Sequence, residues 1–208
     1  MKQIVSTPDR EMMARCIALS RLSGSAGEYP YGAVIARGGR VVAESINRVA
    51  HDRDVTHHAE VVTISSAQKA LRTVSLDDCT IYVNAEPCAF CCYAIRESRI
   101  RRVVYGLHSP HMGGVSKWKV LTDEDLSRCM PEVFAPPPEI VSGFMAEDAE
   151  QALRDWNPLF TFVIKQRGLF AASEGVPVAA PSSRPATPSR QRAMRFLRRH
   201  FFDHFGRR

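Results

Sequence analysis

The sequence predicts an α/β fold, a three-layer α/β/α sandwich with a mixed central sheet. Short β-branched segments alternate along the chain with longer segments whose apolar residues recur at helical spacing. The first two short segments are joined by a glycine-containing turn, which is typical of an antiparallel hairpin and makes the sheet mixed. With 208 residues, 45% of them hydrophobic, the chain holds enough apolar material for one well-packed domain.

The first part of the chain predicts a helix, a hairpin and a second helix. Apolar residues at helical spacing indicate a helix over residues 9–22, and a loop rich in Gly and Ser follows it. Residues 32–36 and 41–44 predict the two strands of the hairpin. A second helix is expected over residues 56–71. Either Asp54 or Thr56 is placed to cap its first turn.

The next elements alternate strand and helix. Residues 79–84 predict a strand, and Pro87 is expected at the first position of the helix that follows, where a missing N–H costs nothing. Residues 102–105 predict the next strand. Towards the end of the domain we expect a short helix near 123–129, a weak strand at 140–141 and a longer helix from Ala146 toward Lys165.

The charge is unevenly distributed. Residues 171–208 hold eight of the 28 Lys and Arg residues and two of the 22 Asp and Glu residues, so residues 1–170 hold 20 of each. We therefore expect a neutral domain at 1–170, a disordered linker rich in Pro, Ser and Ala at 171–191, and a basic amphipathic tail at 192–208. Such a tail could bind a membrane surface, nucleic acid or a partner protein, or be an extension without function.

Cysteine usage and the N-terminus indicate the compartment. The N-terminal residues lack the apolar segment of a secretory signal, and no apolar run is long enough to span a membrane. Three of the six cysteines are clustered, which favours metal ligation over disulfides. We expect a cytoplasmic protein.

Two short segments carry the residues for zinc chemistry. Cys88 and Cys91 are three apart, so one helical turn places both sulfurs on one side. A catalytic zinc site uses three protein ligands and leaves the fourth position for water, and His58 supplies the third ligand. Glu60 lies two residues beyond His58, where it can move protons without binding the metal. This set predicts one Zn²⁺ per chain and a hydrolytic site.

The two segments, His58-Ala59-Glu60 and Pro87-Cys88-Ala89-Phe90-Cys91, match the pattern of the zinc nucleobase deaminases. Over about residues 8–165 the chain resembles the cytidine and deoxycytidylate deaminase superfamily, closest to the branch of tRNA adenosine, guanine and cytosine deaminases. The resemblance implies a cytidine deaminase-like fold and replacement of a ring amino group by a carbonyl with release of ammonia. It also implies a homodimer.

The same resemblance implies substrate contacts. Asn47 matches the position from which family members hydrogen-bond the substrate, and backbone N–H groups near Ala59 and Cys88 would help to bind the base and the reacting oxygen. Among the aromatic residues, we expect a contact from Tyr31. Two alternatives stay open: Cys92, four residues after Cys88, could replace Cys91 as a ligand, and His57 adjoins His58 but is expected to face solvent or support the site.

The substrate is less well determined. A neutral domain offers no excess of cations for a tRNA backbone, so a small purine such as guanine is favoured. The alternatives are adenosine 34 of a tRNA and a cytosine-type pyrimidine. Where the tRNA adenosine deaminases usually carry a Gly-Ala-Ala-Gly-Ser run, this chain has Met112-Gly113-Gly114-Val115-Ser116. A non-enzymatic alternative is a zinc-stabilised binding module that acts through its basic tail.

Overall fold

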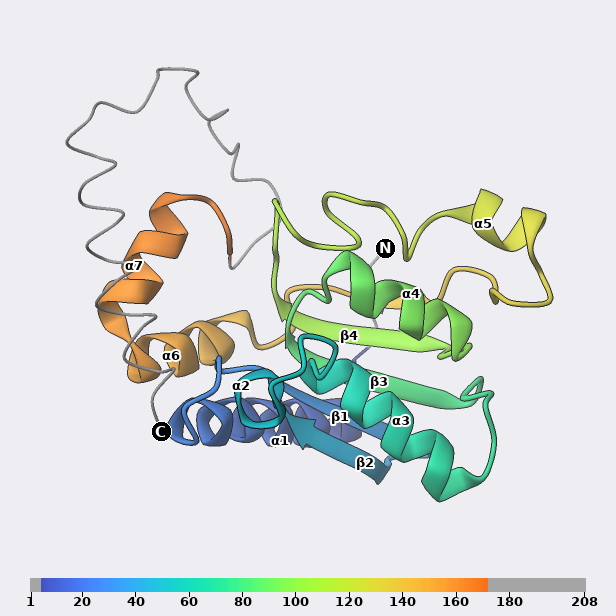
Figure 1. Cartoon of the computed structure of the whole chain (residues 1–208), viewed down its shortest axis with the longest axis horizontal. Coiled ribbons are helices and arrows are strands. Elements are labelled where there is room, and N and C mark those ends of the chain that lie inside the picture. Colours follow the sequence, from blue (N-terminus) through green and yellow to red (C-terminus); the bar gives the residue numbers. More distant parts are fainter. Residues whose placement is uncertain (1–4, 172–208) are drawn as a thin grey trace, which may run out of the picture. The chain divides into compact units, whose positions relative to one another are not determined.

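The computed structural model describes residues 5–171, and these form a five-stranded sheet with helices on both faces (Figure 1). The strands lie in the order β2-β1-β3-β4-β5, where β1 is antiparallel to β2 and β3, and β4 and β5 run parallel to β3. The predicted mixed α/β fold is confirmed. The strand bounds are β1 Gly32–Arg37, β2 Arg40–Ile46, β3 Cys79–Ala85, β4 Arg102–Leu107 and β5 Glu139–Val141.

Each face of the sheet is covered by its own group of helices. Neighbouring residues of β1 point to opposite sides: Val34 lies in the apolar cluster with α1 and α6, whereas Ile35 lies in the cluster with α3 and α4. Because both faces are covered, this strand is apolar at successive positions. The helix bounds are α1 Thr7–Ser25, α2 Val49–Asp52, α3 Ala59–Leu71, α4 Ala89–Glu97, α5 Glu124–Cys129, α6 Ala146–Trp156 and α7 Pro158–Gln166.

The starts of α3 and α4 differ from the predicted starts. Helix α3 begins at Ala59 with His58 as its N-cap; neither Asp54 nor Thr56 caps it, because the Asp54 carboxylate accepts hydrogen bonds from the Thr56 backbone N–H (2.8 Å) and hydroxyl (2.6 Å). Helix α4 begins at Ala89 with Cys88 as its N-cap, so Pro87 lies before the helix. Each correction places a predicted metal ligand directly at a helix N-terminus.

The prediction of a single long helix from Ala146 toward Lys165 was wrong. The structure has two helices that meet at Asn157, whose backbone is extended (φ −157°, ψ 98°). The Asn157 side chain accepts a hydrogen bond from the backbone N–H of Phe160 (2.9 Å) and so caps α7, and Pro158 needs no partner at the first position. The apolar periodicity continues across this break, which is why it resembled one helix.

A buried carboxylate ties α1 to the sheet. Asp9 is 4% exposed; it completes a capping box with Ser6, accepts a hydrogen bond from the Tyr82 hydroxyl (2.8 Å) and pairs with Arg102. Burial acts to raise the pKa of Asp9, but the hydrogen bonds from Arg102, Ser6 and Tyr82 outweigh it and lower the pKa to about 2. The contact joins the start of α1 to β3 and β4.

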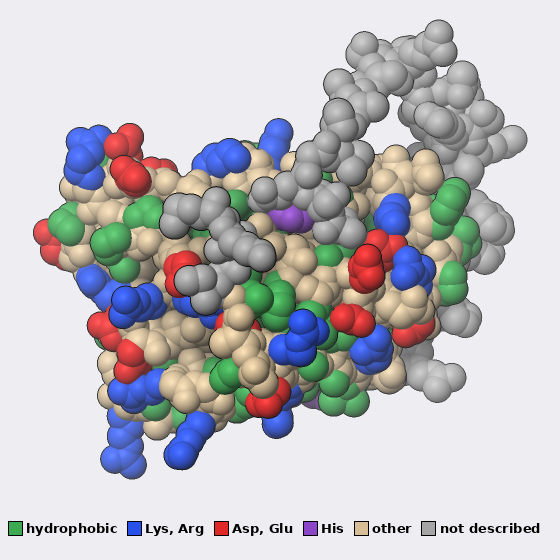
Figure 2. Space-filling model, turned by 180° about the vertical axis from the view of Figure 1, so that it is seen from behind, with side chains coloured by type: hydrophobic (Ala, Val, Ile, Leu, Met, Phe, Trp, Pro, Cys, Tyr) green, Lys and Arg blue, Asp and Glu red, His purple; other side chains and the backbone are tan. Residues whose placement is uncertain are grey.

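The predicted linker at 171–191 and tail at 192–208 lie, except for Ala171, outside the described residues. Within residues 5–171, no helix is long and apolar enough to cross a membrane. On the face shown in Figure 2, acidic and basic side chains are interspersed, and neither sign forms a continuous patch.

Candidate metal centre

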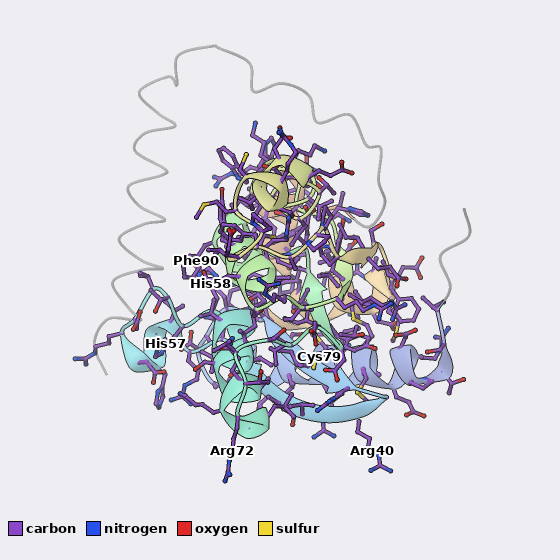
Figure 3. All side chains as sticks on the ribbon, turned by 90° about the vertical axis from the view of Figure 1, so that its right-hand side faces the viewer. Arg40, His57, His58, Arg72, Cys79 and Phe90 are labelled. Atoms are coloured by element: carbon purple, nitrogen blue, oxygen red, sulfur yellow. The ribbon has the colours of Figure 1, made fainter. Side chains whose placement is uncertain are left out.

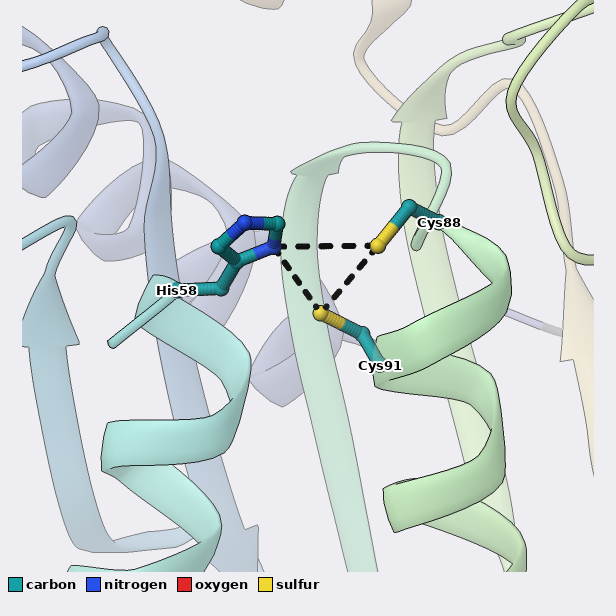
Figure 4. Close-up of side chains that lie close together, drawn as sticks. All are labelled: His58, Cys88 and Cys91. Carbon is teal, nitrogen blue, oxygen red and sulfur yellow. Dashed lines mark hydrogen bonds between the residues drawn. The ribbon is translucent and has the colours of Figure 1, made fainter. Parts of the chain in front are cut away.

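The three predicted metal ligands converge between the starts of α3 and α4 (Figure 4). The Nδ1 atom of His58 lies 3.7 Å from the Cys88 sulfur and 3.4 Å from the Cys91 sulfur, and the two sulfurs are 3.6 Å apart. Ligand atoms bound tetrahedrally to one zinc ion lie about 3.5 to 3.8 Å from one another, since Zn–S and Zn–N bonds are about 2.3 and 2.0 Å. The residues therefore fit a zinc ion, and the site supports one Zn²⁺.

The local electrostatics favour a thiolate at Cys88. Hydrogen bonding with Cys91 is the largest influence and, with a further contribution from His58, lowers the pKa of Cys88 to about 4 against the opposing effect of burial. Cys88 is also the N-cap of α4, where the helix dipole and the free backbone N–H groups stabilise negative charge. The site is thus prepared to hold a cation.

Cys92 is directed away from the ligands. It is fully buried, and its sulfur lies 3.4 Å from the backbone oxygen of Pro87. In residues 5–171, the one group of His, Cys, Asp and Glu atoms close enough to share a metal consists of His58, Cys88 and Cys91. Gly114 packs against Cys92 so closely that a Cβ there would lie 2.1 Å from the sulfur. The structure therefore favours Cys91 over Cys92 as the ligand.

Glu60 lies in the first turn of α3, beside the ligands. Removal from bulk water is the largest cause that raises the pKa of Glu60, and the charge of Cys88 adds to it. A carboxyl group with a raised pKa is suited to both accepting and donating a proton near neutral pH. Ala59 is fully buried at the first position of the same helix, so its backbone N–H belongs to the unpaired donors of the helix N-terminus.

The two other predicted substrate contacts are neighbours. The backbone N–H of Asn47 donates to the backbone oxygen of Tyr31 (3.0 Å), and the N–H of Arg48 donates to the oxygen of His57 (3.0 Å), next to the ligand His58. Burial is the largest cause that raises the pKa of Tyr31, and the nearby charges of Glu60 and Cys88 raise it further. The structure thus brings Tyr31 and Asn47 to the side of the metal centre.

His57 and Phe90 support the ligand from two directions. His57 is half-buried, and its Nδ1 atom lies 2.7 Å from the Asp52 carboxylate, so it contacts a supporting acid and not the metal group. Phe90 packs edge-on against the His58 ring with centroids 5.9 Å apart, and Figure 3 shows the two side chains together. Phe90 is 47% exposed and forms part of the rim of the centre.

Sequence reasoning assigned no role to Glu86, although it lies within the Glu-Pro-Cys segment. The buried Glu86 carboxylate accepts hydrogen bonds from the backbone N–H groups of Ser109 (2.7 Å), Val115 (2.9 Å) and Ser116 (2.6 Å) and from the Ser116 hydroxyl (2.6 Å). It thereby holds the loop that carries the divergent Met-Gly-Gly-Val-Ser run against the start of α4. Only its position two residues before the ligand Cys88 could have indicated this from the sequence.

The remaining aromatic and histidine residues are mostly structural. Trp156 packs against Phe160 (centroids 5.2 Å apart) and Tyr29, whereas Trp118 is 58% exposed. His108 is 4% exposed, and its Nδ1 atom lies 3.3 Å from the Tyr105 hydroxyl.

Comparison with known proteins identifies several relatives. The zinc-binding region of the cytidine and deoxycytidylate deaminases matches residues 6–107. The tRNA-specific adenosine deaminase of Agrobacterium fabrum is 34% identical over 69% of this chain and 90% of its own length. A tRNA(Ile)-lysidine synthase of Deinococcus deserti is 33% identical, but this chain spans only 26% of it. A solved structure from work on A-to-I editing by tRNA:A34 deaminases is 33% identical, with a TM-score of 0.62 over 69% of this chain and 99% of that chain.

Proposed function

The chain belongs to the cytidine and deoxycytidylate deaminase superfamily, and from this premise we propose that it hydrolytically deaminates adenosine within a tRNA. The observation that carries the proposal is the group of His58, Cys88 and Cys91, of which Cys91 is buried and the other two are partly buried, with Glu60 beside it. The adenosine in tRNA is taken from relatives that this chain matches over 90% and 99% of their length. Water replaces the amino group, and the products are a ring carbonyl and ammonia.

Each residue has a distinct part in this proposal. His58, Cys88 and Cys91 would hold a zinc ion, which would supply a nucleophile at neutral pH by lowering the pKa of a water molecule to about 7. Glu60 accepts the proton of the attacking water and delivers protons to the ring nitrogen and to the departing amine. Asn47, Tyr31 and the backbone N–H of Ala59 bind the base and hold the reacting carbon near the metal.

A free purine such as guanine is the second candidate, and the charge of the domain favours it. Residues 1–170 hold 20 basic and 20 acidic residues, and the face in Figure 2 shows both signs mixed. A tRNA-binding surface normally carries an excess of cations along the phosphates. In the tRNA proposal, the net +6 of residues 171–208 supplies that excess.

A substrate panel tests the proposal. The zinc-loaded full chain is incubated with an unmodified tRNA carrying adenosine 34, the same tRNA with guanosine 34, adenosine, guanine and cytosine, and both ammonia and inosine are measured. We expect inosine and ammonia from the adenosine 34 tRNA, with a rate that falls as salt rises. Ammonia from guanine alone would replace the first candidate by the second. Ammonia from none of them, with zinc bound, would favour the binding module.

We also propose that the chain acts as a homodimer. Phe90 (47% exposed) and Tyr93 (48%) on α4 and Trp118 (58%) in the segment after β4 are large exposed side chains that contact with a second copy of the chain would bury. Sedimentation of the purified chain distinguishes a dimer from a monomer.

A further inference from the structure

A further buried acidic residue, Glu28, contacts the predicted substrate-binding residue Asn47. It sits in the loop between α1 and β1 and is 4% exposed. Its carboxylate accepts three hydrogen bonds: from the Asn47 side-chain amide (2.9 Å), from the backbone N–H of Ala50 (3.1 Å) and from that of His51 (2.7 Å). The two backbone groups belong to the first turn of α2. Glu28 therefore caps the short helix α2 from another loop, and it also holds the side chain of Asn47.

The contact with Glu28 determines which way round the Asn47 amide lies. A carboxylate offers only acceptors, so the NH₂ group of Asn47 must face it; the reversed amide would place two oxygens about 3 Å apart. The Asn47 amide oxygen then points elsewhere. Within residues 5–171, no group donates a hydrogen bond to this oxygen. The oxygen is also not fully enclosed, because in that range the Ser75 hydroxyl is the one fully enclosed side-chain nitrogen or oxygen that lacks a partner. Among the described residues, the buried Asn47 (3% exposed) thus keeps an amide oxygen without a partner.

Asn47 lies on a segment that is hydrogen-bonded to the surroundings of the metal centre. Asn47 is joined to Tyr31 by a backbone hydrogen bond, and the next residue, Arg48, is joined to His57, which precedes the ligand His58. The short helix that Glu28 caps connects Asn47 to this same segment. A change at Glu28 is therefore transmitted to the substrate side without touching the metal ligands.

We propose that Glu28 is a positioning residue that orients Asn47 so that its amide oxygen accepts a hydrogen bond from a donor group of the substrate. The inference rests on the proposed function, since it assumes that Asn47 contacts the substrate. Glu28 itself touches neither the metal nor the base. If its carboxylate is replaced by an amide, the Asn47 side chain can turn over and present its NH₂ group instead.

A double-mutant cycle separates this role from helix capping alone. We expect Glu28→Gln and Asn47→Ala each to lower kcat/KM at least about tenfold, and the double variant to be no worse than Asn47→Ala, since Glu28 acts through Asn47. Zinc content should stay near one per chain in all three. Glu44→Gln is the matched control: it removes a carboxylate on β2 that pairs with Arg15 of α1, and it should keep wild-type kinetics. Losses that multiply in the double variant would mean that Glu28 only supports α2 and would overturn the inference.

A second measurement does not depend on turnover. In the zinc-loaded full chain, the side-chain amide signal of Asn47 is identified in nitrogen-15 NMR by its absence in Asn47→Ala. We expect its protons to exchange with solvent at least about tenfold faster in Glu28→Gln than in the wild type or Glu44→Gln. Unchanged exchange would overturn the inference. If the wild type deaminates none of the panel, the proposed function fails, and the exchange measurement still decides whether Glu28 orients Asn47.

Discussion

His58 and Cys88 occupy the same structural position on neighbouring helices. Each is the N-cap residue of its helix with an extended backbone (φ −61°, ψ 148° and φ −67°, ψ 167°), and their ligand atoms lie 3.7 Å apart although the residues are 30 positions apart in sequence. An N-cap side chain projects from the open end of the helix, beside its unpaired N–H groups. Two helix N-termini thus meet at one cation site.

The choice between the neighbouring cysteines is tested by zinc content. We expect Cys91→Ala to hold less than about a tenth of the wild-type zinc and to lose activity, because it removes one of three protein ligands. Cys92→Ala is the matched control and should keep about one zinc per chain, since its sulfur faces Pro87. Metal analysis of the purified variants gives the answer. Equal zinc loss in both variants would show that the ligand assignment is wrong.

The proton-transfer role of Glu60 is tested by Glu60→Gln. The amide keeps the shape of the side chain but cannot carry a proton, so kcat on the identified substrate should fall by about 10²- to 10⁴-fold. Bound zinc should stay near one per chain, because Glu60 is not a ligand. Steady-state kinetics and metal analysis on the same sample separate the two effects. Full turnover by this variant would refute the proposed role.

The Asp9 contact predicts a pH-dependent part of the stability. The folded-state pKa of about 2 lies below the ordinary value of 3.8, so the stabilisation is complete above about pH 4 and is lost as the pH falls through about 2. We expect Asp9→Asn to lower the free energy of unfolding by about 2 kcal/mol at pH 7, with the difference shrinking below pH 4. Urea unfolding at several pH values measures it.

Asp125→Asn is the control for this experiment. Asp125 pairs with Arg128 on the surface, where both side chains are more than 70% exposed, so its removal should change the free energy of unfolding by less than about 0.5 kcal/mol. An Asp9→Asn effect as small as that of the control would contradict the structural role of Asp9.

The close packing of Gly114 on Cys92 predicts a coupled pair of substitutions. A Cβ at residue 114 would lie 2.1 Å from the Cys92 sulfur, so Gly114→Ala should lower the free energy of unfolding by about 1–3 kcal/mol. In the Cys92→Ala background the sulfur is gone, and the added penalty of Gly114→Ala should be smaller. Thermal or urea unfolding of the four chains gives the coupling. Strictly additive effects would show that the two residues do not meet.

The fold and the ligand set could be predicted from the sequence because they depend on local pattern. Apolar spacing indicated the strands and most helices, and the three-residue spacing of Cys88 and Cys91 placed two sulfurs on one side of a helical turn. The helix starts were less predictable: Asp54, Thr56 and Pro87 are all residues that occur at helix N-termini, and local preference could not choose among neighbouring positions.

What the tertiary structure decided are the contacts between distant segments. The sequence favoured Cys91 but left Cys92 open as the alternative ligand, and the packing of Gly114 and Pro87 around Cys92 accounts for its sulfur lying away from the metal group. Likewise, no pattern links Glu28 to Asn47, 19 positions apart in different loops. Periodicity reports which side of a helix or strand is buried, whereas the pairing of buried polar groups depends on the order in which strands and helices pack. That order brings the loops before β1 and after β2 together beside the metal centre.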